Sequence, residues 1–474
     1  MIKKVRFIEP GSDIPQKQSI SNIFTYNKFI RNPSTGLIIL TTIVKQSIDD
    51  TLMYSEAISK VDFDDVTDSD IVFIGINTFS AVRGYEIAKI IKEKSNALIV
   101  MGGLHATLNY KEAALYCDYV LRGEGEEIIM KFIKAINNND LLNFSGVVYY
   151  KDGKLICTGD PVPPQNLSTI PDRNLVHGYK KVAKYDTLWP QVHASRGCPH
   201  NCDYCTVIKL FGRTMRTRTP ENVVEDIRQA VAFHKRKIIP RLNDVVWITD
   251  DNFHADRTWA VTLLQAIIDS EPKCHFSIQA RYEIGFDDEL LELMKKAGFI
   301  EVAMGIEFLE DESFEEFNKK SSRDEIVRSI KNIKKHGIGV RGLLMVGADN
   351  HTIGVGKKIV DFVIKNKIHG VLIQSMFFVP GTVAYDTHKN SLIHENWEKY
   401  NGNVVHYPKN ISPYDLQKEI IYASRKIYSL KRLLANLFRY KWVNKILFFG
   451  EFFWQRSFRK ELADELSFLK SLDK

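Results

Sequence analysis

The sequence predicts an α/β protein made of two successive runs of alternating strands and helices, followed by a helical C-terminal region. Short apolar runs alternate with helical periodicity over residues 1–150, and the same alternation resumes from Gln191. Between the two runs, the prolines of residues 161–171 mark an extended connection that is typical of a domain boundary. The sequence therefore indicates two α/β domains joined by a linker.

Composition is that of a globular protein with real cores. The chain has 474 residues, of which 44% are hydrophobic and 26% charged. No apolar run reaches the roughly 18 residues that a membrane-spanning helix needs. The net charge of +7 is modest and its Lys and Arg residues are dispersed, which argues against sequence-specific nucleic-acid binding. The N-terminus enters a strand-like pattern without a signal-peptide profile, so we expect a cytoplasmic location.

The first run predicts a doubly wound, Rossmann-like parallel sheet over residues 1–150. Buried strands are expected at 71–76, 97–101 and 118–122, and a helix follows the first of them to about Lys94. Each strand ends in a small or glycine-rich turn, and open α/β sheets bind ligands at that edge. None of these turns is a G-x-G-x-x-G dinucleotide fingerprint or a Walker loop.

A hairpin is predicted at residues 146–157, with Lys-Asp-Gly-Lys at its turn, and residues 151–189 are assigned as the linker. The second run predicts strands near residues 191–195, 244–250, 274–281, 300–306, 339–346 and 370–378. The intervening helices are expected near residues 220–235, 256–270, 287–297, 322–336 and 355–367.

The loop after the first strand of the second run carries Cys198, Cys202 and Cys205 at the spacing C-x3-C-x2-C. Three clustered thiolates suit an iron–sulfur cluster or zinc. A closed zinc site or a four-thiolate cluster needs a fourth ligand, and His200 would serve only if the tight loop folded back. A [4Fe–4S] cluster on three thiolates leaves one iron open to a substrate or cofactor. The alternative is a loop that is cysteine-rich by chance.

The other three cysteines, Cys117, Cys157 and Cys274, are scattered and do not form a disulfide framework.

The cysteine spacing, with Tyr204 just before the last cysteine, resembles the signature of the radical SAM superfamily. The resemblance implies that Cys198, Cys202 and Cys205 hold a [4Fe–4S] cluster whose open iron chelates S-adenosylmethionine. Tyr204 would then pack on the adenine or cover the cluster. The resemblance also implies that residues 190–380 form a partial (β/α)6 TIM-like barrel with its chemistry at the carboxyl ends of the strands.

Polar side chains follow other strands of this predicted barrel, and the resemblance implies contacts with S-adenosylmethionine for four of them. Asp250 or Asp251 would accept from its ammonium group. Arg281 suits its carboxylate, and Glu307 suits the ribose hydroxyls or the ammonium. The alternative for each is a strand-end side chain that makes an ordinary loop hydrogen bond. No catalytic residue is assigned.

The N-terminal block IGINTFSA…GYEIAK…VMGGLHAT…DYVLRGEGE resembles the cobalamin-binding domain that precedes many radical SAM cores. The residues that would lie against the corrin ring or its nucleotide tail are Thr78, Ser80, Gly102, Gly103, Gly123 and Glu124. The histidine motif D-x-H-x-x-G is absent, and His105 is not assigned as a cobalt ligand. The alternative is a domain that keeps this fold without holding cobalamin.

Residues 381–474 are predicted to form a helical extension. Phe377–Thr382 resembles a strand end of cobalamin radical SAM proteins. The stretch Leu430–Leu472 is helical in pattern and rich in Phe, Trp, Lys and Arg. A basic, aromatic-rich helix can lie in a membrane interface, but we favour a tail packed on its own domain.

The resemblance implies a radical SAM enzyme that binds a [4Fe–4S] cluster, S-adenosylmethionine and cobalamin. It would methylate an unactivated carbon through a 5′-deoxyadenosyl radical. The alternatives are a cobalamin-dependent oxidoreductase or cyclase without methyl transfer and, in another class, a zinc-bearing ligand-binding protein. The expected partners are a small-molecule or lipid substrate and an electron donor such as flavodoxin or ferredoxin. We expect no nucleic acid, and a membrane surface is not favoured.

Overall fold

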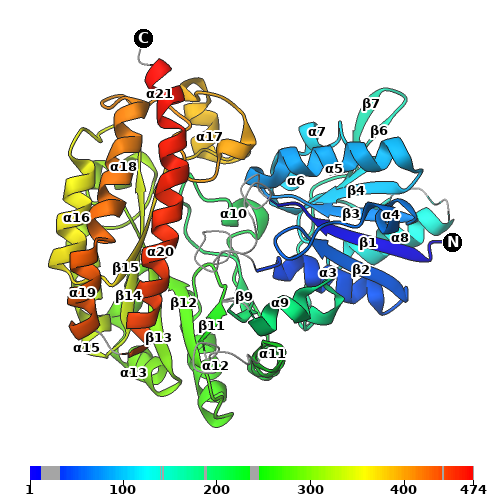
Figure 1. Cartoon of the computed structure of the whole chain (residues 1–474). Coiled ribbons are helices and arrows are strands. Elements are labelled where there is room, and N and C mark those ends of the chain that lie inside the picture. The colour runs from blue at the N-terminus through cyan, green and yellow to red at the C-terminus, as the bar shows by residue number, and fades with distance from the viewer. Residues whose placement is uncertain are drawn as a thin grey trace. The chain divides into compact units, whose positions relative to one another are not determined.

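The computed structural model describes residues 1–11, 32–138, 140, 143–185, 189–234, 245–439 and 442–472. These residues form two compact units. The first unit contains the described chain up to Cys198 and again from Thr206 to His234 (Figure 1). The second unit contains Pro199–Cys205 and the chain from Val245 onward.

The first unit is built on a seven-stranded sheet of order β2-β1-β3-β4-β5-β6-β7. Its strands are Lys4–Glu9 (β1), Asp50–Ser55 (β2), Ile71–Gly75 (β3), Leu98–Gly102 (β4), Tyr119–Leu121 (β5), Val147–Lys151 (β6) and Lys154–Cys157 (β7). Strands β1 to β5 are parallel, and the predicted hairpin adds β6 and β7 antiparallel to the edge. The strand order reverses between β1 and β3, and ligands of such sheets bind at the carboxyl ends of strands beside that point.

The helices of this unit pack on both faces of the sheet, as the doubly wound prediction requires (Figure 1). Those that lie between the strands of this sheet along the chain are Thr35–Lys45 (α3), Phe63–Thr67 (α4), Ala81–Lys94 (α5), Gly103–Leu108 (α6), Tyr110–Ala113 (α7) and Ile128–Asn138 (α8). Phe7 and Phe73 stack at 4.9 Å between their ring centroids, in the core that α3 and α8 cover. Because both faces are covered, β3 reads as a continuous apolar run.

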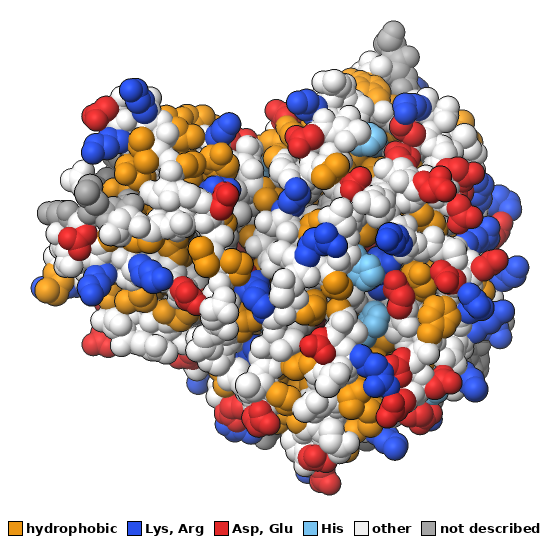
Figure 2. All heavy atoms as spheres, turned by 180° about the vertical axis from the view of Figure 1, so that it is seen from behind, with side chains coloured by type: hydrophobic (Ala, Val, Ile, Leu, Met, Phe, Trp, Pro, Cys, Tyr) orange, Lys and Arg blue, Asp and Glu red, His pale blue; other side chains and the backbone are white. Residues whose placement is uncertain are grey.

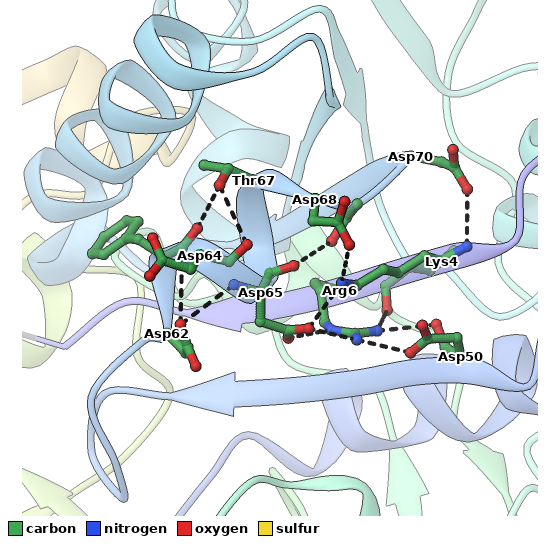
Figure 3. Close-up of polar contacts among 12 residues, drawn as sticks. Lys4, Arg6, Asp50, Asp62, Asp64, Asp65, Thr67, Asp68 and Asp70 are labelled. Atoms are coloured by element: carbon green, nitrogen blue, oxygen red, sulfur yellow. Dashed lines mark hydrogen bonds and ion pairs between the residues drawn. The ribbon is translucent and has the colours of Figure 1, made fainter.

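An ion-pair network holds the start of β1 (Figure 3). Arg6 binds both carboxylate oxygens of Asp65, at 2.5 and 2.8 Å, and its Nη2 lies 2.7 Å from Asp50. Lys4 reaches Asp65 at 3.0 Å and Asp68 at 2.8 Å. Hydrogen bonding from Arg6 lowers the pKa of Asp65 far below its usual range. This network lies at the opposite end of β1 from the ligand-binding edge, so we assign it a structural role.

The second sheet has six strands in the order β15-β14-β13-β12-β11-β8. They are Gln191–Val192 (β8), Val245–Ile248 (β11), His275–Ala280 (β12), Phe299–Glu307 (β13), Gly339–Val346 (β14) and Gly370–Ser375 (β15). The crossover helices are Pro220–Phe233 (α11), Arg257–Asp269 (α12), Asp288–Lys296 (α13), Arg323–Lys335 (α15) and Val355–Lys365 (α16). Strands β11 to β15 pair in parallel and in chain order, and β15 and β8 stand at opposite ends of the order. The predicted partial, TIM-like barrel is confirmed.

The C-terminal region consists of Pro413–Ile427 (α18), Leu430–Arg439 (α19), Trp442–Asp464 (α20) and Leu466–Leu472 (α21). Phe458 and Leu462 are buried, and the side-chain Nε2 of Gln417 on α18 donates to the Leu462 carbonyl at 2.8 Å. These contacts agree with the packed tail that we favoured. Some aromatic and basic residues of this stretch cannot be placed: the side chains of Trp442, Lys445, Leu447, Phe448 and Phe449 are not described, and Lys441 lies outside the described residues.

Side chains of this region also close the outer edge of β15. The Tyr428 hydroxyl lies 2.8 Å from both the amide nitrogen and the carbonyl oxygen of Val371, and Gln455 Nε2 lies 3.4 Å from the same oxygen. None of the described helices is long and apolar enough to cross a bilayer. Figure 2 shows basic and acidic side chains interspersed over the face that it displays, in agreement with the dispersed charge of the sequence.

Candidate cluster and cofactor site

The cysteine loop begins at a glycine that no other residue replaces without strain. Gly197 has φ +95°, and a Cβ there would collide with the carbonyl oxygen of Thr214. The amide of Cys198 then donates to the Gly212 carbonyl at 3.4 Å. None of the described cysteines forms a disulfide. Local backbone geometry therefore presents the first cysteine of the motif.

Hydrogen bonds also fix the middle of the loop. The amide of Asp203 donates to the Phe317 carbonyl at 3.1 Å, and the Asp203 carbonyl accepts from the Ala384 amide at 3.0 Å. The side-chain amide of Asn318 donates to the Asn201 carbonyl at 3.0 Å. Asn318 has φ +50°, a conformation that asparagine tolerates better than most residues. Segments more than 100 residues away along the chain thus hold the loop in place.

The Val-Pro-Gly-Thr segment explains how Ala384 reaches the loop. Thr382 caps Val383–His388 (α17) by accepting from the Tyr385 amide at 3.2 Å, and Gly381 turns the chain at φ +84°. The Ala384 amide lies in the first turn of this helix, where amides have no partner within the helix. The sequence marked this segment by resemblance only, without assigning it a structural role.

Tyr204 packs among aromatic side chains of the second unit. Its ring meets Phe308 and Phe317 edge-on, with centroids 6.5 and 6.0 Å away. Burial raises the pKa of the Tyr204 hydroxyl well above its usual value, so the phenol is neutral. The predicted contact of Tyr204 with adenine stays a prediction.

Arg281 contacts a cysteine of the motif. The guanidinium is buried, and its Nη1 lies 4.0 Å from the Cys202 sulfur. Glu283 binds the same guanidinium at 2.9 Å, and the Lys320 carbonyl accepts from it at 2.6 Å. The predicted contact of Arg281 with the carboxylate of S-adenosylmethionine stays a prediction.

Glu307 ends β13 in a strained conformation. Its φ of +66° lies in the left-handed region, at a register shift between β13 and β14. The buried Lys319 lies 3.2 Å from its carboxylate and donates to the Gly305 carbonyl at 2.9 Å. A ribose hydroxyl or an ammonium group at Glu307 would have to share the carboxylate with Lys319. The sequence alone did not indicate a role for Lys319.

Asp250 and Asp251 follow β11 and lie at the same edge of the sheet as the end of β12. Asp250 is buried, and the neighbouring Asn252 accepts from the Arg281 amide at 3.4 Å. Burial lowers the pKa of His254 to about 4, and its Nδ1 has no hydrogen-bond partner among the residues that the structure describes. The sequence did not single out Asn252 and His254 as site residues. Both belong to the polar run Thr249–His254 that follows this strand, and that run was the signal that could have indicated them.

The glycines of the N-terminal sheet edge are required by the protein itself. Gly103 has φ +91°, and a Cβ there would lie 2.7 Å from the Ile76 carbonyl oxygen. Gly123 has φ +79°, and a Cβ there would lie 2.5 Å from the Cβ of Pro161. A side chain at Gly103 would therefore strike the backbone of Ile76, whether or not a ligand is bound. The predicted contact of Gly103 with the corrin ring stays a prediction.

The structure brings the ends of β3, β4 and β5 together. The amide of Ile76 donates to the Gly102 carbonyl at 2.9 Å, and the Gly123 amide donates to Thr107 Oγ1 at 2.9 Å. Thr78 Oγ1 lies 3.4 Å from Nδ1 of the fully buried His105.

The two remaining predicted cobalamin contacts are engaged within the protein. Ser80 Oγ accepts from the Asn77 amide at 3.1 Å in a capping box. The carboxylate of Glu124 is bound by Arg196 and Arg216.

The donor set of the cysteine loop is three thiols, at positions 198, 202 and 205, and three clustered thiolates suit an iron–sulfur cluster. Within the described residues, no three His, Cys, Asp or Glu side chains are placed to hold a single metal ion. Arg281 Nη1, 4.0 Å from the Cys202 sulfur, places a positive charge beside this cysteine.

Comparison with known families identifies a domain that begins at β8, the first strand of the second sheet. Residues 192–363 match the model of the family described as the radical SAM superfamily. This part of the chain is a radical SAM domain. A radical SAM domain implies a [4Fe–4S] cluster and S-adenosylmethionine as cofactors. Enzymes with this domain generally use small-molecule substrates and external electron donors.

The chain is similar to several named enzymes. It is 25% identical over 384 residues to bacteriochlorophyllide d C-8(2)-methyltransferase of Chlorobaculum tepidum, covering 80% of this chain and 81% of the relative. It is 28% identical to the anaerobic magnesium-protoporphyrin IX monomethyl ester cyclase of Rubrivivax gelatinosus, covering 58% of this chain and 50% of that protein.

Among solved structures, the radical S-adenosylmethionine methyltransferase TsrM of Kitasatospora setae, with cobalamin and a [4Fe–4S] cluster bound, matches with a TM-score of 0.65. The sequence identity is 15%, and the match covers 81% of this chain and 74% of TsrM. This match shows that the chain shares the fold of TsrM.

Proposed function

We propose that this radical SAM enzyme binds cobalamin and methylates an unactivated carbon of a small molecule. The observation that carries the proposal is the anchored C-x3-C-x2-C loop beside the barrel-like sheet, in a chain whose N-terminal sheet has a glycine-rich carboxyl edge. The methyltransferase name of a relative that matches four-fifths of the chain supports the reaction type. The fold shared with TsrM supports the cofactor set.

The chain's own residues would hold the cofactors. Cys198, Cys202 and Cys205 would bind three irons of a [4Fe–4S] cluster. Asp250 and Asp251, at the end of β11, would accept from the ammonium of S-adenosylmethionine. When bound, the cofactors supply one-electron cleavage of S-adenosylmethionine and a transferable methyl group. The protein orients them and excludes water and oxygen.

A second candidate is a cobalamin-dependent oxidation or cyclisation without methyl transfer. The similarity to the anaerobic cyclase favours it, although the match covers only half of that protein. Methyl transfer is preferred because the methyltransferase relative matches over a larger share of both chains.

The proposed partners follow from the same reaction. Reduction of the cluster needs an electron donor, and we propose a flavodoxin or a ferredoxin. The buried Phe458 and Leu462 favour a tail packed on its own domain over one inserted in a membrane surface. Flotation of the full chain with anionic liposomes at low salt tests this, and co-migration would support a membrane-associated, lipid substrate.

Anaerobic reconstitution followed by product analysis with methyl-labelled S-adenosylmethionine tests the proposed function. We expect about four irons and four sulfides per chain, which the zinc alternative does not allow. We also expect a bound corrin, and label in the product. Cys198→Ala should abolish formation of 5′-deoxyadenosine, whereas Cys274→Ala, a matched control, should not. Turnover without label transfer would favour the oxidation or cyclisation instead.

A further inference from the structure

A buried carboxylate of the N-terminal unit lies between two arginines that flank the cysteine loop. Glu124 follows β5, and its side chain is only 3% exposed. Its Oε2 lies 2.5 Å from Arg196 Nη1, and its Oε1 lies 2.5 Å from Arg216 Nη2. We infer that Glu124 is a positioning residue for Cys198, the first ligand of the cluster; this rests on the proposed assignment of the cluster ligands.

The two arginines face each other across a short antiparallel ribbon. Ser195–Arg196 (β9) pairs with Arg216–Thr217 (β10), and Arg196 lies directly opposite Arg216. The two side chains are 6% and 16% exposed. Like charges directly opposite on a ribbon repel each other, and water screens them little at this burial. Glu124 bridges them and turns a repulsive pair into an attractive one.

A second carboxylate, that of Glu126, binds Arg196 but not Arg216. Glu126 Oε1 lies 2.5 Å from Arg196 Nη2, so Arg196 has two acidic partners. Arg216 otherwise donates to the carbonyl oxygens of Pro164 and Phe211, which carry no full charge. Without the charge of Glu124, Arg216 would remain partly buried beside Arg196, and none of its partners among the described residues would be a carboxylate. An uncompensated buried charge is strongly destabilising.

The ribbon determines where Cys198 lies. Arg196 is two residues before Cys198, and Gly197 between them packs against the Thr214 carbonyl on the returning segment. The Cys198 amide donates to the Gly212 carbonyl on that segment. Separation of the two strands would therefore displace the cysteine from its partners. Glu124 acts on the cluster ligand through the ribbon and does not need to touch the cluster.

Glu124 was predicted to contact cobalamin, and the structure gives its carboxylate a different partner set. The loop after β5 thus serves two purposes. Its backbone forms part of the sheet edge at which cobalamin is expected, and its carboxylate fixes the strand that leads into the cysteine loop. The shape of the N-terminal edge and the position of a cluster ligand are linked through one side chain.

Glu124→Gln tests the inference because it keeps the shape of the side chain and removes its charge. Glu127→Gln is the matched control, since Glu127 is exposed and lies in the same loop. The measurements on the reconstituted full chain are iron and sulfide content, the rate of iron loss to a chelator, and the electron paramagnetic resonance spectrum of the reduced cluster. Circular dichroism reports whether each variant is folded.

We expect Glu124→Gln to lose iron several-fold faster than Glu127→Gln and to show an altered spectrum. Adding Arg216→Gln to Glu124→Gln should slow the loss again, because Arg196 keeps Glu126 and the repulsion is gone. A folded Glu124→Gln with the iron content, loss rate and spectrum of the control would overturn the inference. So would a double variant no better in folding or iron retention than the single variant. A wild-type chain that binds no four-iron cluster would instead refute the proposed function.

Discussion

Arg281 places Nη1 4.0 Å from the sulfur of Cys202, and Glu283 holds the guanidinium in that orientation. A cation beside a cluster ligand stabilises the added electron of the reduced state. Arg281→Gln should therefore make the reduction potential of the cluster more negative, by roughly 60 mV for each ~1.4 kcal/mol of that stabilisation lost.

Spectroelectrochemical titration of the reconstituted protein measures this shift. Arg257→Gln is a suitable control, because Arg257 is a half-exposed arginine bound to Asp287 and Glu289. An equal or more positive potential in Arg281→Gln would show that Arg281 does not act on the cluster electrostatically.

The hydrogen bond from Asn318 to the Asn201 carbonyl gives a second prediction. Asn318→Gly keeps the left-handed backbone conformation and removes only the side-chain donor. The loss of one such bond is worth about 1 kcal/mol. We expect faster cluster loss to a chelator with little change in melting temperature. Unchanged cluster loss would mean that the two backbone bonds of Asp203 suffice to hold the loop.

Buried His406 predicts a dependence of stability on pH. Burial lowers its pKa to about 4, and its Nε2 lies 2.8 Å from the Gly347 carbonyl oxygen. In the unfolded chain a histidine binds a proton below about pH 6.5. Between these values the unfolded state holds more protons, so stability falls as the pH drops, by up to about 1.4 kcal/mol per pH unit.

His406→Gln removes this contribution while keeping a donor toward Gly347. The variant should be less stable than the wild type at pH 7, and the gap in melting temperature should narrow at pH 5. A gap that stays constant with pH would contradict the assignment of a buried, neutral histidine.

The packed tail predicts unequal effects for two phenylalanines. Phe458 is 3% exposed and stacks on Trp454, whereas Phe468 is 41% exposed. Phe458→Ala should destabilise the second unit by about 3–5 kcal/mol, because it leaves a cavity. Phe468→Ala should change stability by much less. Equal melting temperatures for the two variants would indicate that α20 contributes little to the fold.

The sequence predicted the secondary-structure elements more completely than the interaction partners of individual side chains. The strands and helices of the barrel follow from hydrophobic periodicity, which local burial determines, and the cysteine loop follows from its spacing. The partners of Glu124 lie 72 and 92 residues away, so only the folded chain shows that its carboxylate is engaged. Arg281 could be placed at a strand end, but its direction depends on Glu283 and the Lys320 carbonyl.

The glycines illustrate the same limit. A glycine at position 103 indicates a close approach of the backbone, and the sequence cannot tell whether a ligand or another strand approaches. In the folded chain the approaching group is the backbone of Ile76.

The contacts of Val371 bear on self-association of the protein. Strand β15 ends the order of its sheet, and an exposed edge strand is a template for pairing with another chain. Tyr428 and Gln455 occupy the outward-facing amide and carbonyl of Val371, so a foreign strand finds no open hydrogen-bonding group at that position. A chain cut before Tyr428 would lose both side chains, and we expect it to aggregate through this strand.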